Sequence, residues 1–160
     1  MLFSNKFVKL IENNADDLTK KWMRLVKSHP GTTKYRSYDE KHLYAMAFNV
    51  YSRLGQWLSR ETTKKEIAKH FTALGAKRRE EGFRISEVIQ ALTITRRVLW
   101  FKVLEDGFID SALDLRAALD LDNSVVQFFD RCIFFAAVGY EQGEIPSPES
   151  LTLPPDAVLK

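Results

Sequence analysis

The stretch from Glu80 to Leu104, EEGFRISEVIQALTITRRVLWFKVL, decides the fold predicted for this chain. Gly82 interrupts the preceding helical pattern, and Ser86 is a residue type that caps helices by accepting a backbone N–H bond. Neither Gly nor Pro follows until Gly107, so the sequence predicts one long helix between these points.

The apolar residues of this predicted helix fall on two arcs when it is projected at about 100° per residue. The first arc holds Ile85, Val88, Ile89, Leu92, Leu99, Trp100 and Val103, and the narrower second arc, on the opposite side, holds Ile94, Val98 and Phe101. A helix that is apolar on two sides has to be covered twice. We therefore expect it to lie centrally in the fold, or between the core and a partner.

Arg96 interrupts the first arc between Leu92 and Leu99. In one interpretation its aliphatic stem packs while the guanidinium reaches water or a neighbouring carboxylate. In the other, it is a buried charge that serves a conformational switch or binds an anionic ligand. Arg96 is therefore the candidate switch residue, with both interpretations open.

Length and composition are typical of one soluble globular domain. The chain has 160 residues, of which 45% are hydrophobic and 28% charged, and its net charge is only +3. The basic run Lys77-Arg78-Arg79 is answered at once by Glu80-Glu81, which indicates a solvated helix face and argues against a nucleic-acid partner. No segment approaches the roughly 20 apolar residues that cross a bilayer, and the N-terminus lacks a secretory signal. We expect a cytoplasmic protein without a membrane partner.

Helical spacing of apolar residues recurs along the rest of the chain, and no strand-type alternation is present. Capping boxes at Ser37-Tyr38-Asp39-Glu40 and Thr63-Lys64-Lys65-Glu66 predict two helix starts. Besides the central helix, the predicted helices cover residues 3–27, 40–59, 63–82, 110–119 and 123–142. The expected fold is all-α, with five or six helices around a single core in residues 1–142. A proline-rich, linker-like tail follows in residues 143–160.

Two apolar residues project from the polar side of the last predicted helix. Phe134 and Val138 lie one turn apart there. Together with the second arc of the central helix, they indicate that two copies of the chain pair through helices. The predicted homodimer interface consists of Ile94, Val98, Phe101, Phe134 and Val138.

Residue patterns for catalysis or metal binding are missing from the sequence. It has no phosphate-binding Gly-rich loop, no HExxH pair and no Gly-x-Ser-x-Gly elbow. Cys132 is the single cysteine, so an intrachain disulfide and a multi-cysteine metal site are excluded. Its apolar neighbours predict a buried thiol. We expect a protein that is not an enzyme and holds no metal.

His70 is the one histidine that suggests a cofactor. It precedes Phe71 on a predicted helix, one helix before the aromatic-rich central helix. An all-α chain of this size can hold haem through a proximal histidine, so His70 is the candidate axial ligand. The alternative is a partly buried or surface histidine with an ordinary hydrogen bond.

The sequence resembles the N-terminal helical domains of the RsbR/RsbRD co-antagonist family, the sensory modules of bacterial stressosome signalling. The resemblance rests mainly on Glu81-Gly82-Phe83-Arg84-Ile85-Ser86-Glu87 running into Thr95-Arg96-Arg97-Val98-Leu99-Trp100. Weaker matches are Glu12-Asn13-Asn14-Ala15-Asp16 leading into Trp22, and the Tyr35-Arg36 loop.

This resemblance implies a globin-like helical bundle that typically lacks haem and dimerises through its late helices. It further implies a signal-input role, with output passed to a following domain or to a partner kinase, and it carries over no catalytic residue. Two hypotheses therefore remain for the function. One is a non-enzymatic regulatory module that dimerises and responds to a partner or small ligand, and the other is a globin-like sensor that binds haem or an apolar ligand.

Overall fold

The structure, a computed structural model, describes residues 5–59 and 62–142. Within these ranges it contains α-helices and a short 3₁₀ helix but no strand, which confirms the all-α prediction. The helices are α1 (Asn5–Asn13), α2 (Ala15–Ser28), η1 (Thr33–Ser37), α3 (Glu40–Ser52), α4 (Leu54–Leu58), α5 (Lys64–Glu80), α6 (Ile85–Asp106) and α7 (Ala112–Gln142). The predicted tail, residues 143–160, lies outside the described residues.

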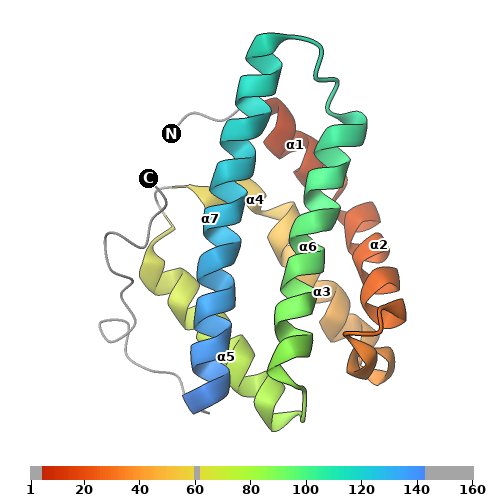
Figure 1. The fold of residues 1–160 in the computed structure, drawn as a ribbon, viewed down its shortest axis with the longest axis vertical. Helices are drawn as coiled ribbons and strands as arrows, with labels where there is room; N and C mark the ends of the chain where they lie inside the picture. Colours follow the sequence, from red (N-terminus) through yellow and green to blue (C-terminus); the bar gives the residue numbers. More distant parts are fainter. Residues whose placement is uncertain (1–4, 60–61, 143–160) are drawn as a thin grey trace.

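The two longest helices, α6 and α7, run antiparallel beside each other on one side of the molecule (Figure 1). Helix α5 crosses α7 and makes the most extensive helix–helix contact of the described fold. Helices α1 and α2 pack on α6, α3 packs on α2, and α4 packs on α1 and α7. The result is a bundle whose core lies between the α6–α7 pair and the N-terminal helices.

Helix α6 has the central position that its two apolar arcs predict. Val88 and Leu99 of the first arc and Ile94 and Val98 of the second are all buried. Two hydrogen bonds also attach the N-terminal helices to its backbone. The indole Nε1 of Trp22 donates to the Ala91 carbonyl at 3.1 Å. The hydroxyl of Tyr51 donates to the Thr95 carbonyl at 2.9 Å. Both polar groups are therefore satisfied inside the core.

The start of α6 differs from the prediction. The capping residue is Arg84 and not Ser86, which is exposed and already inside the helix. The Arg84 backbone N–H donates to the carboxylate of Glu87 at 3.4 Å. The same carboxylate accepts from the Lys34 backbone N–H at 2.9 Å. Glu87 thus joins the start of α6 to η1, which is a tertiary contact that spacing alone does not reveal.

Two predicted helices are each interrupted once. The segment 3–27 breaks at Asn14, whose side-chain amide donates to the Leu10 carbonyl at 2.7 Å and competes with the backbone pattern. The segment 40–59 breaks at Arg53, where the backbone leaves the helical region at φ −121° and ψ 27°. Neither break involves Gly or Pro, so the usual breaker signals missed both.

The predicted helices 110–119 and 123–142 are one helix, α7. The intervening Asp120, Asp122 and Asn123 are poor helix formers, which suggested a boundary. The buried Leu121 and Val125 continue the same apolar stripe through this region. Packing against the core therefore keeps the helix continuous, as tertiary contacts commonly override weak propensity.

Cys132 lies in the core and is fully buried, as predicted. Burial raises the pKa of its thiol, so the thiolate is disfavoured. No helix of the described residues combines the length and the apolarity that a membrane crossing requires.

Candidate functional site

The motif that begins at Glu81 forms the turn between α5 and α6. The Phe83 backbone N–H donates to the Arg78 carbonyl, and the Gly82 N–H to the Arg79 carbonyl, both at 3.0 Å. This pair of bonds is a Schellman cap, which ends a helix with a residue at positive φ. Gly82 has φ +83° and supplies that residue without a Cβ penalty. The turn sends the Phe83 side chain back into the core, where it is buried.

Arg78, at the end of α5, is the most deeply buried charged side chain of the described residues. Its side chain is 1% exposed. One terminal nitrogen, Nη1, donates to the Tyr38 hydroxyl at 2.8 Å and to Glu81 Oε1 at 2.6 Å. The other, Nη2, faces the thioether sulfur of Met46, and Nε is buried without a hydrogen-bond partner. The guanidinium is therefore neutralised on one edge and poorly satisfied on the other.

Aromatic rings surround this guanidinium. Its carbon lies 4.7 Å from the centre of the Tyr38 ring and 5.5 Å from that of Phe83. Tyr35 packs on Phe83 with ring centres 4.6 Å apart. Burial raises the pKa of Tyr35 to about 12, although the positive charge of Arg78 opposes the shift. Cation–π contacts of this kind become stronger when water is excluded, so the aromatic rings help to hold the charge in place.

A groove of about 640 Å³ opens between α3 and α5, beside Arg78. We call it the α3–α5 groove. Its walls include His42, Met46 and Asn49 from α3, and His70, Leu74 and Arg78 from α5. This volume falls within the several hundred Å³ typical of small-molecule sites. Most of the groove wall is apolar, and Arg78 lies where α5 ends.

His70 lies toward the other end of the groove. Its ring packs against Trp57 of α4 with ring centres 5.3 Å apart, and one part of the side chain is exposed. Desolvation lowers the pKa of His70. The smaller cavity that His70 also lines measures about 40 Å³, which is far too small for a porphyrin. Haem on His70 would have to occupy the open α3–α5 groove, and this cofactor remains a prediction.

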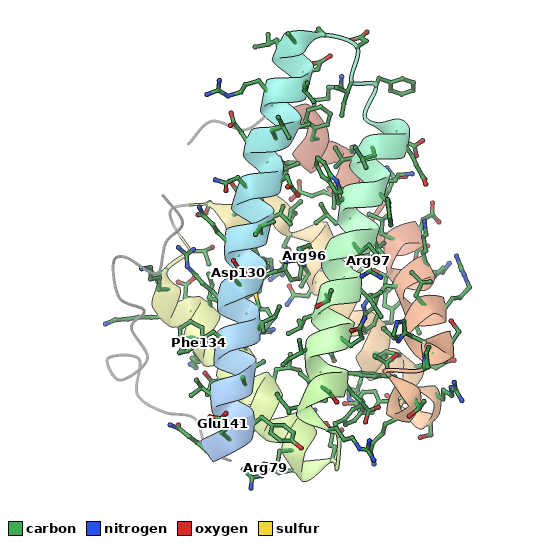
Figure 2. All side chains as sticks on the ribbon, viewed as in Figure 1. Arg79, Arg96, Arg97, Asp130, Phe134 and Glu141 are labelled. Carbon is green, nitrogen blue, oxygen red and sulfur yellow. The ribbon has the colours of Figure 1, made fainter. Side chains whose placement is uncertain are left out.

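Arg96 does not lie in the core. It is half-buried between α6 and α7, where it lines a shallow groove of about 390 Å³ with Trp100, Asp122 and Val126 (Figure 2). Burial raises the pKa of Asp122, and the charge of Arg96 opposes that shift. The first interpretation of Arg96, in which a packed stem carries its charge to a neighbouring carboxylate, agrees with this placement.

The outer surface of α6 and α7 carries a row of apolar side chains around Arg96. We call it the α6–α7 face and define it by Trp100, Leu104, Leu119, Val126 and Ile133. Leu104 is 50% exposed and Leu119 is 52% exposed, and the other three are half-buried. On α7, these residues recur at seven-residue spacing, which keeps them on one side of the helix.

The predicted dimer interface is partly wrong. Ile94 and Val98 are 2% and 1% exposed because α6 turns their arc into the core, so they cannot meet a second chain in this fold. Val138 is half-buried against the core. Phe101 and Phe134 are 44% and 42% exposed, and Figure 2 shows Phe134 on the outer side of α7. Of the five residues, these two are accessible on the surface.

One of the two interpretations of Arg96 made it a buried charge, whereas the structure buries the charge of Arg78 instead. Arg78 sits inside a basic run, and such runs usually mark solvated surfaces. The missed signal is its spacing, because Ile67, Phe71 and Leu74 form an apolar stripe that Arg78 continues four residues later. Within the described ranges, no group of three or more His, Cys, Asp or Glu side chains could hold a metal ion.

Comparison with known proteins agrees with this arrangement. The family model of the RsbT co-antagonist protein RsbRD N-terminal domain matches residues 16–145, which include the α5–α6 turn, both grooves and the α6–α7 face. No curated protein and no solved structure matches the chain. The match covers most of the sequence, and the chain belongs to the family of RsbRD N-terminal domains, which regulate stress signalling.

Proposed function

We propose that this chain is a non-enzymatic signal-input module that works as a homodimer and passes its signal to a kinase or another signalling protein. Family membership supports the regulatory role. The dimer is supported by the α6–α7 face, and this surface is the observation that carries the proposal.

The α6–α7 face suits contact with a second copy of the same chain. An isologous dimer needs a surface that is complementary to itself. This surface has apolar residues along both helices and charges of both signs, with Arg96 and Arg97 on α6 and Asp122 and Asp130 on α7 (Figure 2). A two-fold axis between the helix pairs would bring the arginines of one copy toward the aspartates of the other. The apolar row would then form the centre of a four-helix contact.

The same face connects the dimer to the core. Trp100 and Ile133 are partly exposed but also pack on the buried cluster. A change in how α5 or α3 packs can therefore reach the dimer surface through α6 and α7, since the α5–α7 contact is the most extensive in the described fold. This is the kind of two-state packing change through which sensory modules transmit a signal.

Native mass spectrometry at micromolar concentration tests the dimer. Val126→Glu places a charge among the apolar side chains at the centre of the α6–α7 face, and we expect the dimer to shift to monomer while the helical circular dichroism spectrum is kept. Gln56→Glu adds the same charge at an exposed position of α4 and should stay dimeric. A monomeric parent protein, or a Val126→Glu variant that remains dimeric, would overturn this proposal.

A further inference from the structure

The Arg78 guanidinium has one edge without a proper acceptor. Its Nη1 donates to Tyr38 and Glu81, and Nη2 faces the sulfur of Met46, whereas Nε has no hydrogen-bond partner. The Tyr35 hydroxyl also lies close enough to interact with this guanidinium. A thioether is a weak acceptor, and a buried N–H without a partner is costly. The open edge is formed by Nε–H together with an Nη2–H. These parallel donors are the fork that a carboxylate accepts with both oxygens.

This open edge belongs to a residue that lines the α3–α5 groove, and Met46 lines the same groove. Methionine is the most adaptable of the apolar side chains. A rotation of Met46 would uncover the edge of Arg78 without any change in the backbone. Met46 thus covers the buried charge as a movable side chain.

The remaining wall of the groove is suited to an apolar chain. Between Arg78 and His70 it is formed by small and aliphatic side chains, among them Ala45, Ala73 and Leu74. The stretch of α5 from His70 to Arg78, which forms this part of the wall, is about 12 Å long because each helical residue adds about 1.5 Å. Trp57 closes the far end, and its indole Nε1 is buried without a partner.

The charges on the rim favour an anion over a cation. Lys77 is exposed next to Arg78 and Lys69 is exposed near His70, and Glu66 is the carboxylate that lines the groove with them. Glu81 already pairs with Arg78 through Nη1, on the edge away from the open donors. A negatively charged head group therefore meets a net positive groove, and an apolar body meets the hydrophobic wall.

We propose that the α3–α5 groove binds an amphiphilic carboxylate, with the head group held by the Nε–Nη2 edge of Arg78 and the aliphatic chain lying between α3 and α5. Binding requires Met46 to move off the guanidinium, and this movement changes the contact between α3 and the end of α5. Whether this ligand acts as a signal depends on the proposed signal-input function. Binding itself is independent of the dimer, so the two are measured separately.

Isothermal titration with decanoate, below its micelle concentration, tests the site on the intact protein. Decyltrimethylammonium has the same tail with a cationic head and serves as the matched ligand. We expect decanoate to bind one site per chain, and the ammonium compound to bind about tenfold more weakly or not at all. Equal affinity for both compounds, or no heat from decanoate, would overturn the proposal.

Two variants distinguish the groove from unspecific binding. Ala73→Trp fills the groove and leaves Arg78 unchanged, while Ala112→Trp makes the same replacement at an exposed position where α7 begins (Figure 1). Decanoate should be lost from the first variant and bound normally by the second. Arg78→Lys keeps the charge without the fork, and we expect about tenfold weaker binding. Decanoate binding by Ala73→Trp at the parent affinity would place the ligand elsewhere and overturn the proposal.

Native mass spectrometry of the same samples then separates the two proposals. A parent protein that binds decanoate as a monomer overturns the dimer and supports the ligand site. A dimer that takes up no decanoate overturns the ligand site and supports the dimer.

Discussion

Gly75 of α5 and Gly139 of α7 face the backbone of the opposite helix, and neither position has room for a Cβ atom. A Cβ at Gly75 would overlap the Ala136 carbonyl oxygen, and a Cβ at Gly139 would overlap the Thr72 carbonyl oxygen. The two helices therefore cross with their backbones in contact. This close approach explains why α5 and α7 form the most extensive contact of the described fold.

Replacing either glycine with alanine should destabilise the protein. At a solvent-exposed position inside a helix, replacing Gly with Ala stabilises the helix by about 1 kcal/mol. Here the added methyl group meets backbone that cannot move aside, so we expect the free energy of unfolding to fall by about 3 kcal/mol or more for Gly75→Ala and Gly139→Ala. Urea denaturation measures this, with Gly31→Ala as the control. Gly31 is exposed, and its nearest neighbour is the flexible side chain of His29. If Gly75→Ala were as stable as Gly31→Ala, the close crossing would be wrong.

The pair of Arg78 and Glu81 should respond unequally to the loss of each partner. Glu81→Gln leaves a buried guanidinium without its counter-ion, and we expect a loss of about 3 kcal/mol in the free energy of unfolding. Arg78→Met leaves Glu81, which is 29% exposed and can reach water, so a smaller loss of about 2 kcal/mol is expected. Arg24→Met removes an exposed arginine and should change stability by less than about 0.5 kcal/mol. If Glu81→Gln left the free energy of unfolding unchanged, Arg78 would not depend on Glu81 as its buried counter-ion.

His70 should make the protein less stable in mild acid. Desolvation lowers the pKa of His70 in the folded state below its ordinary value of 6.5, so the unfolded chain binds more protons in that range. The free energy of unfolding therefore decreases as the pH falls below about 6.5, through the folded pKa. Urea midpoints at about pH 8 and about pH 5 measure the change, and His70→Gln should reduce it. His42 lies on the opposite wall of the groove and serves as the control. In His42→Gln, the decrease in the free energy of unfolding that His70 causes at low pH should remain. An NMR titration of His70 with a pKa above 6.5 would refute the prediction.

Two hydroxyl residues near helix starts should behave differently when replaced by alanine. The Thr63 side chain accepts the Glu66 backbone N–H at 3.2 Å and caps α5, so Thr63→Ala should cost about 1 kcal/mol. Ser86 is exposed inside α6, where alanine is the better helix former, so Ser86→Ala should be neutral or slightly stabilising. Thermal unfolding of both variants compares them directly. If Ser86→Ala were destabilised, Ser86 and not Arg84 would be the N-cap of α6.

Local sequence signals predicted much of the helix framework, and they failed where the decisive contact is distant in sequence. The Thr63 cap and the end of α6 at Gly107 follow from local chemistry, and both were predicted. The start of α6 was misplaced because its cap depends on Glu87, which also binds η1. The continuity of α7 was missed because the core compensates for Asp120 and Asn123.

The candidate sites show the same division. Apolar periodicity correctly predicted a central α6, but it cannot show which arc meets the core and which meets solvent. The second arc therefore predicts an interface position for Ile94 and Val98, although α6 buries both residues. Phe101 and Phe134 remain accessible, while the larger α6–α7 face depends on how two helices lie beside each other.

By itself, the sequence determined the all-α class, the long central helix and the family, because helical periodicity, capping residues and the Glu81–Glu87 motif are local properties of the chain. Only the tertiary structure decided which arginine carries the buried charge. Arg78 and Arg96 both interrupt apolar stripes, and a stripe does not reveal what packs against it. The Schellman turn at Gly82 brings Tyr38, Phe83 and Glu81 around Arg78, whereas the antiparallel pairing of α6 and α7 leaves Arg96 at the edge of the core. Burial of a charge depends on its neighbours in space, and those come from segments far apart in the chain.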